Sequence, residues 1–207
     1  MEYDNSPRGY LARARERLLD PALANLFYAA YELRCFVEAR QDDYVDAQKE
    51  YLRSVPKAWN IGAQGKALHA IFDSGRIQHL AWEYDSGQPG YDVFHVPVNS
   101  ALRNGAERLG EFMHVQSKWR PADDPWWQEM RAQVVAVYRE AWMCAQGRLM
   151  SPAFWKEKRI VGSVIIEMPT EQEREAFAGQ HIVGATGVLK VDYLDAPPAG
   201  WVPDVDK

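Results

Sequence analysis

The chain has 207 residues, of which 47% are hydrophobic and 26% are charged, and its formal net charge is −5. These values are ordinary for a globular protein and exclude disorder over the whole chain. The acidic excess lies in residues 123–207, which carry nine basic and thirteen acidic side chains. Such a balance argues against a broad phosphate-binding face of the histone kind.

The first third of the chain is predicted to be helical. Residues 9–19 resemble a short helix, after which Asp20-Pro21 supplies an N-cap and a proline at the first helical position. From Pro21 to about Arg53 there is no glycine and no further proline, which predicts one long helix. Its apolar positions recur at helical spacing: Leu26, Ala30, Leu33 and Val37. A weaker helix is predicted over residues 60–73.

The middle of the chain changes character twice. Two runs rich in aromatic and β-branched residues, 76–84 and 91–98, flank the turn sequence DSGQPG and predict a β-hairpin. A helix over 101–116, capped by Asn99 or Ser100, follows. Asp124-Pro125 then starts a helix to about Arg148. The inward side of that last helix is predicted to carry Met130, Val134, Val137, Tyr138, Ala141 and Trp142.

The C-terminal part is predicted to be mixed. The composition of residues 159–168 predicts a strand, and Thr170 with Glu173 has the spacing of a capping box. Residues 187–195 alternate as a strand does, and the tail is predicted to be extended or disordered. We therefore expect an α+β fold, mostly α. Residues 1–151 would form an antiparallel helical bundle with the β-hairpin inserted at about 76–98, and residues 152–207 a small α/β appendage.

Several functional classes lack their signatures. The sequence contains no P-loop, no G-x-G-x-x-G after a strand, no G-x-S-x-G and no H-E-x-x-H. His79 and His95 lie in opposite arms of the hairpin but on opposite faces, and a metal needs more ligands than two. We expect no metal and no cofactor. The two cysteines lie far apart, and the sequence begins with polar residues, so we expect a reduced, cytoplasmic protein. Because no run of 18 apolar residues occurs, we expect no membrane span.

Two pairs of polar residues are candidates for a site. Arg34 and Glu38 are four residues apart and share one helix face, either as a structural ion pair or as a polar group in a cleft between helices. Arg108 and His114 lie late in the helix predicted over 101–116, with Gly110 between them. An imidazole can transfer protons near neutral pH, and a guanidinium can stabilise charge on a phosphate. They converge only if the helix end is distorted or a partner chain completes the site.

Basic and aromatic residues are candidates for contacts with nucleic acid. Four arginines gather in the first helix, either as a solvated face or as a basic patch: Arg8, Arg13, Arg15 and Arg17. Eight tryptophans are many for this length, and the pair Trp126-Trp127 fits core packing better than base stacking.

A segment with Ala29-Ala30-Tyr31-Glu32-Leu33-Arg34 and Glu38, and a later Leu109-Gly110-Glu111-Phe112-Met113-His114, resembles the HEPN superfamily over about residues 10–150. Many members of that superfamily are toxins or defence-associated ribonucleases, with an Arg four to six residues before a His. Leu109 departs from the polar residue usual after the Arg. The resemblance implies an antiparallel bundle, often a homodimer in which two motifs meet.

Two hypotheses follow from these observations. In the first, an accessory protein of defence or toxin type acts on RNA as a metal-independent endoribonuclease, with Arg108 and His114 catalytic and Arg34 and Glu38 lining the same cleft. In the second, a non-enzymatic binding or assembly protein recognises a protein partner or a small apolar ligand. The acidic balance favours the second hypothesis, and the Arg–His spacing favours the first.

Overall fold

The computed structural model describes residues 3–50, 52, 57, 60–69, 75–85, 89–114, 118–151, 154–156, 159–161, 164–168, 170–180 and 187–206. Within these ranges, helices predominate and the sheets are small and antiparallel, so the predicted α+β, mostly α class is confirmed. None of the described helices is long and apolar enough to cross a membrane.

The chain contacts define two compact units that differ from the predicted division at residue 151. The first unit comprises residues 1–75, 98–145 and 199–207, and the second comprises residues 76–97 and 146–198. The hairpin therefore belongs with the C-terminal segment and not with the helices. The physical reason is hydrogen bonding, because the first strand of the hairpin pairs along its whole length with a strand near the C-terminus.

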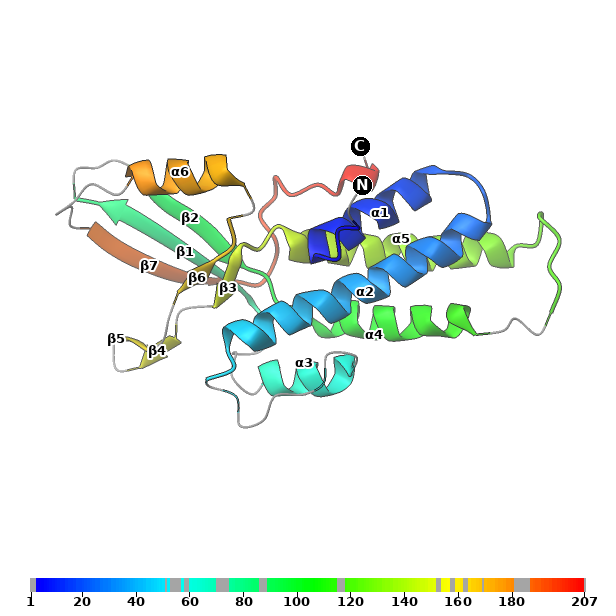
Figure 1. Cartoon of the computed structure of the whole chain (residues 1–207), viewed down its shortest axis with the longest axis horizontal. Helices are drawn as coiled ribbons and strands as arrows, with labels where there is room; N and C mark the ends of the chain where they lie inside the picture. Colours follow the sequence, from blue (N-terminus) through cyan, green and yellow to red (C-terminus); the bar gives the residue numbers. More distant parts are fainter. Residues whose placement is uncertain are drawn as a thin grey trace. The chain divides into compact units, whose positions relative to one another are not determined.

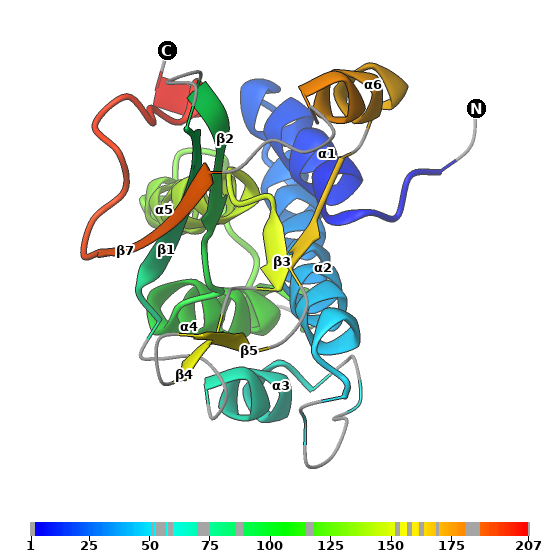
Figure 2. The ribbon, with the colours of Figure 1, turned by 90° about the vertical axis from the view of Figure 1, so that its left-hand side faces the viewer.

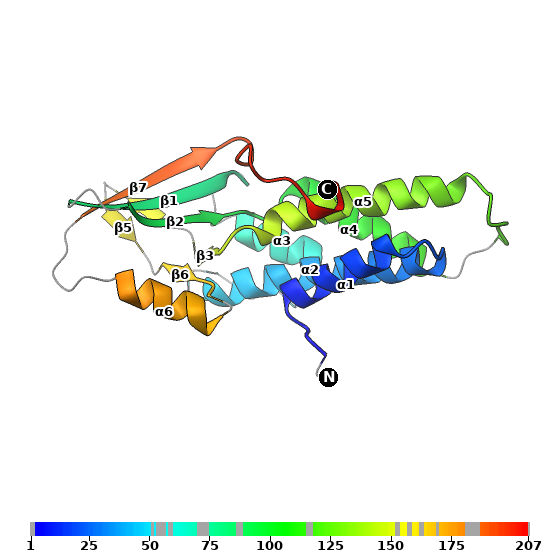
Figure 3. The ribbon, with the colours of Figure 1, turned by 90° about the horizontal axis from the view of Figure 1, so that it is seen from above.

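The first unit is a helical bundle (Figure 1). Its elements are α1 (Pro7–Leu19), α2 (Ala24–Ala47), α3 (Ile61–His69), α4 (Ser100–Leu109), the 3₁₀ turn η1 (Gly110–Met113), α5 (Trp126–Ala145) and the 3₁₀ turn η2 (Asp204–Asp206). Helix α2 contacts α1, α4 and α5. Seen from above, α1 and α2 form one layer and α4 and α5 the other (Figure 3).

The long helix is unbroken but begins later than predicted. A carboxylate oxygen of Asp20 accepts a hydrogen bond from the backbone N–H of Ala22 at 2.8 Å, which holds Pro21 outside the helix. Regular helix starts at Ala24 and ends at Ala47. At that end the N–H of Gln48 bonds to the carbonyl of Val45, a tightened turn that closes the helix. The helix therefore ends about six residues before the predicted end near Arg53.

The core of the first unit matches the predicted inward faces closely. All four positions of the predicted α2 stripe are fully buried: Leu26, Ala30, Leu33 and Val37. Of the six positions predicted for α5, five are buried, and Trp142 is half-buried. Helix α2 also buries Arg40 and Gln41, which an apolar stripe does not predict.

The second unit is built on a three-stranded antiparallel sheet (Figure 2). The predicted hairpin is confirmed as β1 (Ile77–Tyr84) and β2 (Pro89–His95), and β7 (Gly187–Leu194) adds to the free side of β1. The β1–β7 register runs from Ile77 opposite Leu194 to Tyr84 opposite Gly187. Leu80, Val93 and Leu149 form the core, on which Leu189 and Val191 also pack.

The rest of the second unit consists of short elements. The predicted strand over 159–168 is divided, because β5 (Arg159–Val161) pairs with β4 (Phe154–Lys156), whereas β6 (Ile165–Ile166) pairs with β3 (Leu149–Ser151). Helix α6 (Glu171–Gln180) begins with the predicted capping box. The N–H of Glu173 donates to the Thr170 hydroxyl at 3.2 Å, and the N–H of Thr170 donates to the Glu173 carboxylate at 3.1 Å.

Candidate functional site

Arg108 and His114 lie on different elements, because the helix that carries Arg108 changes its geometry before His114. Helix α4 begins at Asn99, whose side chain accepts the N–H of Leu102, and ends at Leu109. From Gly110 the chain continues as the 3₁₀ turn η1, after which His114 has extended backbone and is exposed. Arg108 is exposed in the last turn of α4. The distorted helix end that convergence requires is therefore present.

Arg34 and Glu38 form an ion pair on α2 beside this turn. The Nε of Arg34 lies 3.0 Å from a carboxylate oxygen of Glu38, and both side chains are partly exposed. A Cβ added at Gly110 would lie 2.5 Å from Nη1 of Arg34, so a side chain there would require the flexible Arg34 guanidinium to move. The Arg34–Glu38 pair and the residues that follow Arg108 are thus neighbours in the first unit.

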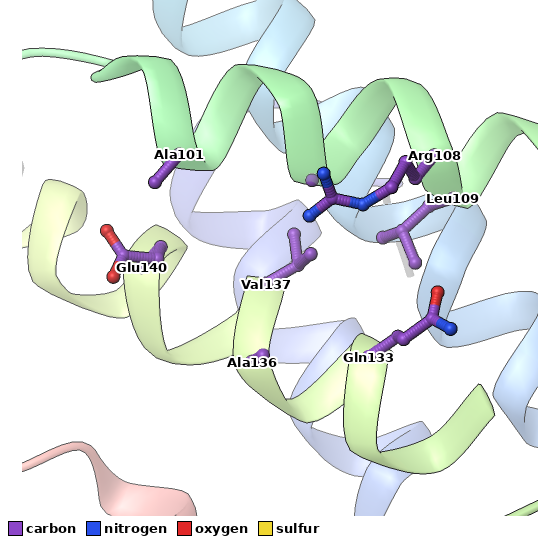
Figure 4. A pocket seen from close by; sticks show the side chains of 8 residues that line it. Ala101, Arg108, Leu109, Gln133, Ala136, Val137 and Glu140 are labelled. Carbon is purple, nitrogen blue, oxygen red and sulfur yellow. The ribbon is translucent and has the colours of Figure 1, made fainter. Parts of the chain in front are cut away.

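A hollow of about 260 Å³ opens between α4 and α5. We call it the α4–α5 groove, and eight residues line it: Ala101, Gly105, Arg108, Leu109, Gln133, Ala136, Val137 and Glu140. Figure 4 shows Arg108 extending along the groove from α4, with Gln133 opposite on α5 and Glu140 at the far end beside Ala101. Of the four residues predicted to form a site, only Arg108 lines this groove.

Small side chains create the groove. A Cβ at Gly105 would lie 2.7 Å from Cγ2 of Val137, so the glycine lets α4 and α5 approach closely at this point. Ala101 and Ala136 flank that contact with single methyl groups and leave the space above it open. The floor is therefore apolar and narrow, and the polar groups come from its walls.

The carboxylate at the far end is held in place by the start of α4. The Nδ2 of Asn99 donates to Oε2 of Glu140 at 3.1 Å, while Oδ1 of Asn99 accepts the N–H of Leu102 at 2.8 Å. One amide side chain thus caps α4 and orients the Glu140 carboxylate on α5. At the other end, no described carboxylate forms an ion pair with Arg108. The groove therefore presents a cation that lies over Val137 and a fixed anion beside Ala101 (Figure 4).

The basic patch of α1 is partly neutralised within the first unit. Arg13 pairs with Glu32 at 3.0 Å, and Arg15 pairs with Asp204 at 2.8 Å. The guanidinium of Arg17 lies 5.5 Å from the ring centre of Tyr28. Two of the four arginines of the patch are thus paired with carboxylates of the first unit, which reduces the positive charge available for phosphates.

The tryptophan pair at the start of α5 belongs to an aromatic cluster. The Trp126 ring centre lies 5.7 Å from that of Phe112 and 4.9 Å from that of Trp127, in edge-on arrangements. Phe27 on α2 completes the cluster, 5.9 Å from Trp127. This geometry is typical of packing aromatics and joins η1 to the beginnings of α2 and α5.

Burial and local contacts characterise Cys144 and two of the histidines. Burial raises the pKa of the Cys144 thiol, against the smaller opposing effect of Arg40. His95 is buried with Nδ1 2.8 Å from the carbonyl of Leu149, while His79 on the other face of the sheet contacts Asp92. His181 lies outside the described residues. In the part of the chain that the structure describes, no three His, Cys, Asp or Glu residues are grouped to hold a metal.

The sequence singles out neither Gln133 nor Glu140, and it predicts Asn99 as a candidate helix cap but not its contact with Glu140. Glu140 is one of many glutamates on helices, and only tertiary packing brings it opposite α4. A weak signal does exist in the spacing of Ala101 and Gly105, one helical turn apart on α4, because small residues so placed permit close helix approach. Nothing in that spacing predicts which charged residues the partner helix supplies.

The comparisons with known proteins add no relative. No protein-family model matches the chain, and no curated protein or solved structure is significantly similar to it. The resemblance to the HEPN superfamily therefore stays a prediction, and any functional argument depends on the geometry described above.

Proposed function

We propose that the protein is a binding protein that takes a small ligand in the α4–α5 groove. The observation that carries this proposal is that Arg108 and Glu140 line one hollow whose other residues are mostly apolar, with the Arg108 side chain extending toward the Glu140 side. A concave apolar surface with a few fixed polar groups is the usual form of a ligand site. The ligand we propose is accordingly amphipathic, and not simply apolar as the sequence analysis expected.

The lining of the groove favours binding over chemistry. Among its eight residues only Arg108 and Glu140 are charged, and none carries a hydroxyl, a thiol or an imidazole. The Glu140 carboxylate is engaged by the Asn99 amide, an arrangement that fixes orientation. Nucleophilic or acid–base catalysis ordinarily needs an activated nucleophile beside a base, and this lining offers no such pair.

A matched pair of alanine substitutions tests the proposal. Ala136 and Ala12 are both exposed on helices, but only Ala136 lines the groove. A library of small amphipathic compounds would be screened against isotope-labelled protein by amide chemical shifts. We expect hits to shift the amides of α4 and α5, to bind wild type and Ala12→Leu equally, and to lose at least tenfold in affinity with Ala136→Leu. Equal binding to both variants, or no hit on these helices, would contradict the proposal.

RNA cleavage is the second candidate, and one observation favours it. The 3₁₀ turn places His114 beyond the end of α4, where it is exposed. Arg34, which is ion-paired with Glu38, lies against Gly110, a residue between Arg108 and His114 in the sequence. In this candidate His114 transfers the proton, Arg108 stabilises the phosphate, and a homodimer brings two such motifs together. No metal would take part. The pairing of α1 arginines with internal carboxylates counts against it.

The RNA candidate has its own direct test. Purified protein would be incubated with mixed RNA and a chelator across a range of concentrations, with sedimentation analysis to establish whether it dimerises. We expect cleavage to be lost by ~10²–10⁴-fold in His114→Ala, as for a missing acid–base group, and only partly retained in Arg108→Lys because ammonium lacks the forked contact. Intact RNA with wild-type protein would eliminate this candidate.

We also propose that the protein acts in the cytoplasm. The support is redox chemistry, since Cys35 on α2 and Cys144 on α5 are both free thiols and Cys144 is buried. Reducing compartments preserve such thiols. Fractionation of cells that express the native protein would check this assignment.

A further inference from the structure

The two charged ends of the α4–α5 groove suggest the chemical class of its ligand. Arg108 has no described carboxylate as a partner, whereas Glu140 uses Oε2 to accept the Asn99 amide and keeps Oε1 for another donor. From the proposed function we infer that the ligand is a zwitterion, with a carboxylate or similar anion at Arg108 and an ammonium group at Glu140. This inference rests on the proposal that the groove binds a small molecule.

Charge complementarity excludes the simpler alternatives. A ligand with only an anionic group is attracted by Arg108, but it leaves the Glu140 carboxylate without a cationic partner. A ligand with only a cationic group is attracted by Glu140, but it leaves Arg108 without an anionic partner. A ligand with an anion and a cation at its two ends gives Arg108 and Glu140 each an oppositely charged partner. Repulsion between like charges lowers the affinity for ligands with the wrong charge. The guanidinium can make two parallel hydrogen bonds to a carboxylate, which also fixes the orientation of the ligand.

The length of the groove limits the length of the ligand. Arg108 lies seven residues beyond Ala101 on α4, which corresponds to about 10 Å along a helix at 1.5 Å per residue. Gln133 and Glu140 are seven residues apart on α5 in the same way. Between the two ends lie Gly105 and Val137, which offer an apolar surface suited to methylene groups. Figure 4 shows the Arg108 side chain reaching back over Val137 toward Glu140, so the two charged groups are closer together than this backbone spacing. An amino acid whose charges are separated by a few carbons matches these features.

The orientation of Glu140 is the strongest structural support. Asn99 is fixed by the N–H of Leu102, and it therefore holds the carboxylate in one place before any ligand arrives. Preorganisation of this kind lowers the entropic cost of binding. Asn99 thus becomes a positioning residue of the groove, while Arg108 and Glu140 contact the ligand.

A series of straight-chain probes tests the inference. The probes are ω-amino carboxylates of four to eight carbons, with hexanoate and hexylamine as the matched single-charge compounds, and binding is followed by amide shifts of α4 and α5 and by calorimetry. The variants are Arg108→Gln and Glu140→Gln. The controls are Arg17→Gln and Glu107→Gln, which are exposed outside the groove.

We expect one chain length to bind best and to exceed both single-charge compounds by roughly tenfold or more, as charge-assisted hydrogen bonds do. Arg108→Gln should remove the advantage over hexylamine, and Glu140→Gln the advantage over hexanoate, while both controls keep wild-type affinity. Asn99→Ala should weaken the ammonium-bearing probes and leave hexanoate unchanged.

Two results would overturn the inference, and they differ in what else they imply. If hexanoate or hexylamine binds in the groove as tightly as every ω-amino carboxylate, the groove binds small ligands without preferring zwitterions. The zwitterion inference is then wrong, but the proposed binding function is retained. If neither the probes nor any library compound shifts the amides of α4 and α5, both the zwitterion and the binding function are refuted.

Discussion

Leu33 at the centre of α2 offers the sharpest test of the bundle. Its side chain is 0% exposed, and α2 contacts α1, α4 and α5. Leu19, in the last turn of α1, is the same residue type but 59% exposed. The pair Leu33→Ala and Leu19→Ala therefore compares equal chemical changes in buried and exposed positions.

The expected magnitude follows from burial. Leu-to-Ala changes at buried sites cost about 2–5 kcal/mol, because the lost contacts leave a cavity. A loss of about 3 kcal/mol would lower the melting temperature by roughly 6–12 °C in a chain of this size. Leu19→Ala should stay within ~0.5 kcal/mol of wild type. Leu33→Asp, which adds an unpaired buried carboxylate, should cost several kcal/mol of a total of ~5–15 kcal/mol and abolish the native bundle.

Hydrogen exchange at α2 amides is the appropriate assay, because the chain has two compact units and one global melt can mix their transitions. Circular dichroism at the helix band gives the supporting melt. Equal effects of Leu33→Ala and Leu19→Ala would refute the burial of Leu33. A Leu33→Asp protein with unchanged exchange would refute the arrangement of α2 in the bundle.

Three further outcomes are expected. Tyr138→Phe removes a hydroxyl that donates to Asp204 at 2.6 Å, and it should cost about 1 kcal/mol in denaturant unfolding of the first unit. Thr170→Ala should speed amide exchange at the start of α6 by about fivefold. Although burial opposes it, hydrogen bonding by Thr170 lowers the pKa of Glu173 below 4.5. Protection of α6 should therefore be present above pH 4.5 and decline as pH falls through that lowered pKa. Cys144, buried and with a raised pKa, should resist thiol reagents until the protein unfolds, which mass spectrometry would show.

Local interactions explain what could be predicted from the sequence. Asn99 and Leu102, or Thr170 and Glu173, are three residues apart, so their hydrogen bonds can be inferred without knowledge of the fold. Strand alternation over β7 is equally local, since Val188 is exposed while Val191 packs on the core. These signals fix where elements begin and which face they bury.

Long-range pairing explains what could not be predicted. Residues of β1 and β7 that pair are more than 100 positions apart, and no pattern in either strand specifies its partner. The sequence therefore predicts the hairpin as part of the helical bundle, whereas its strand partner lies near the C-terminus. Arg40 is similarly unexpected, because it is buried at a position where its guanidinium lies 4.8 Å from the ring centre of Tyr44. A charged residue on a helix is ordinarily placed in solvent by sequence reasoning.

The candidate site shows the same division between local and long-range information. The sequence points to Arg108 together with His114, whereas the groove that Arg108 lines also includes Glu140 on another helix. The Arg–His spacing is a property of one segment. The groove depends on Gly105 meeting Val137 across two helices, and no single segment contains that contact.

The dual role of Gly105 leads to a last prediction. The glycine brings α4 against α5 and also leaves the groove open, so a ligand in the groove bridges the two helices that the glycine joins. Any compound that binds only the folded bundle must stabilise it, by about 2.7 kcal/mol at a hundredfold excess over its dissociation constant. The amides of α4 and α5 should then exchange more slowly, and Ala136→Leu should remove this protection while Ala12→Leu preserves it. A compound that binds the wild-type groove without slowing exchange in either helix would show that the groove is not part of the bundle's cooperative structure.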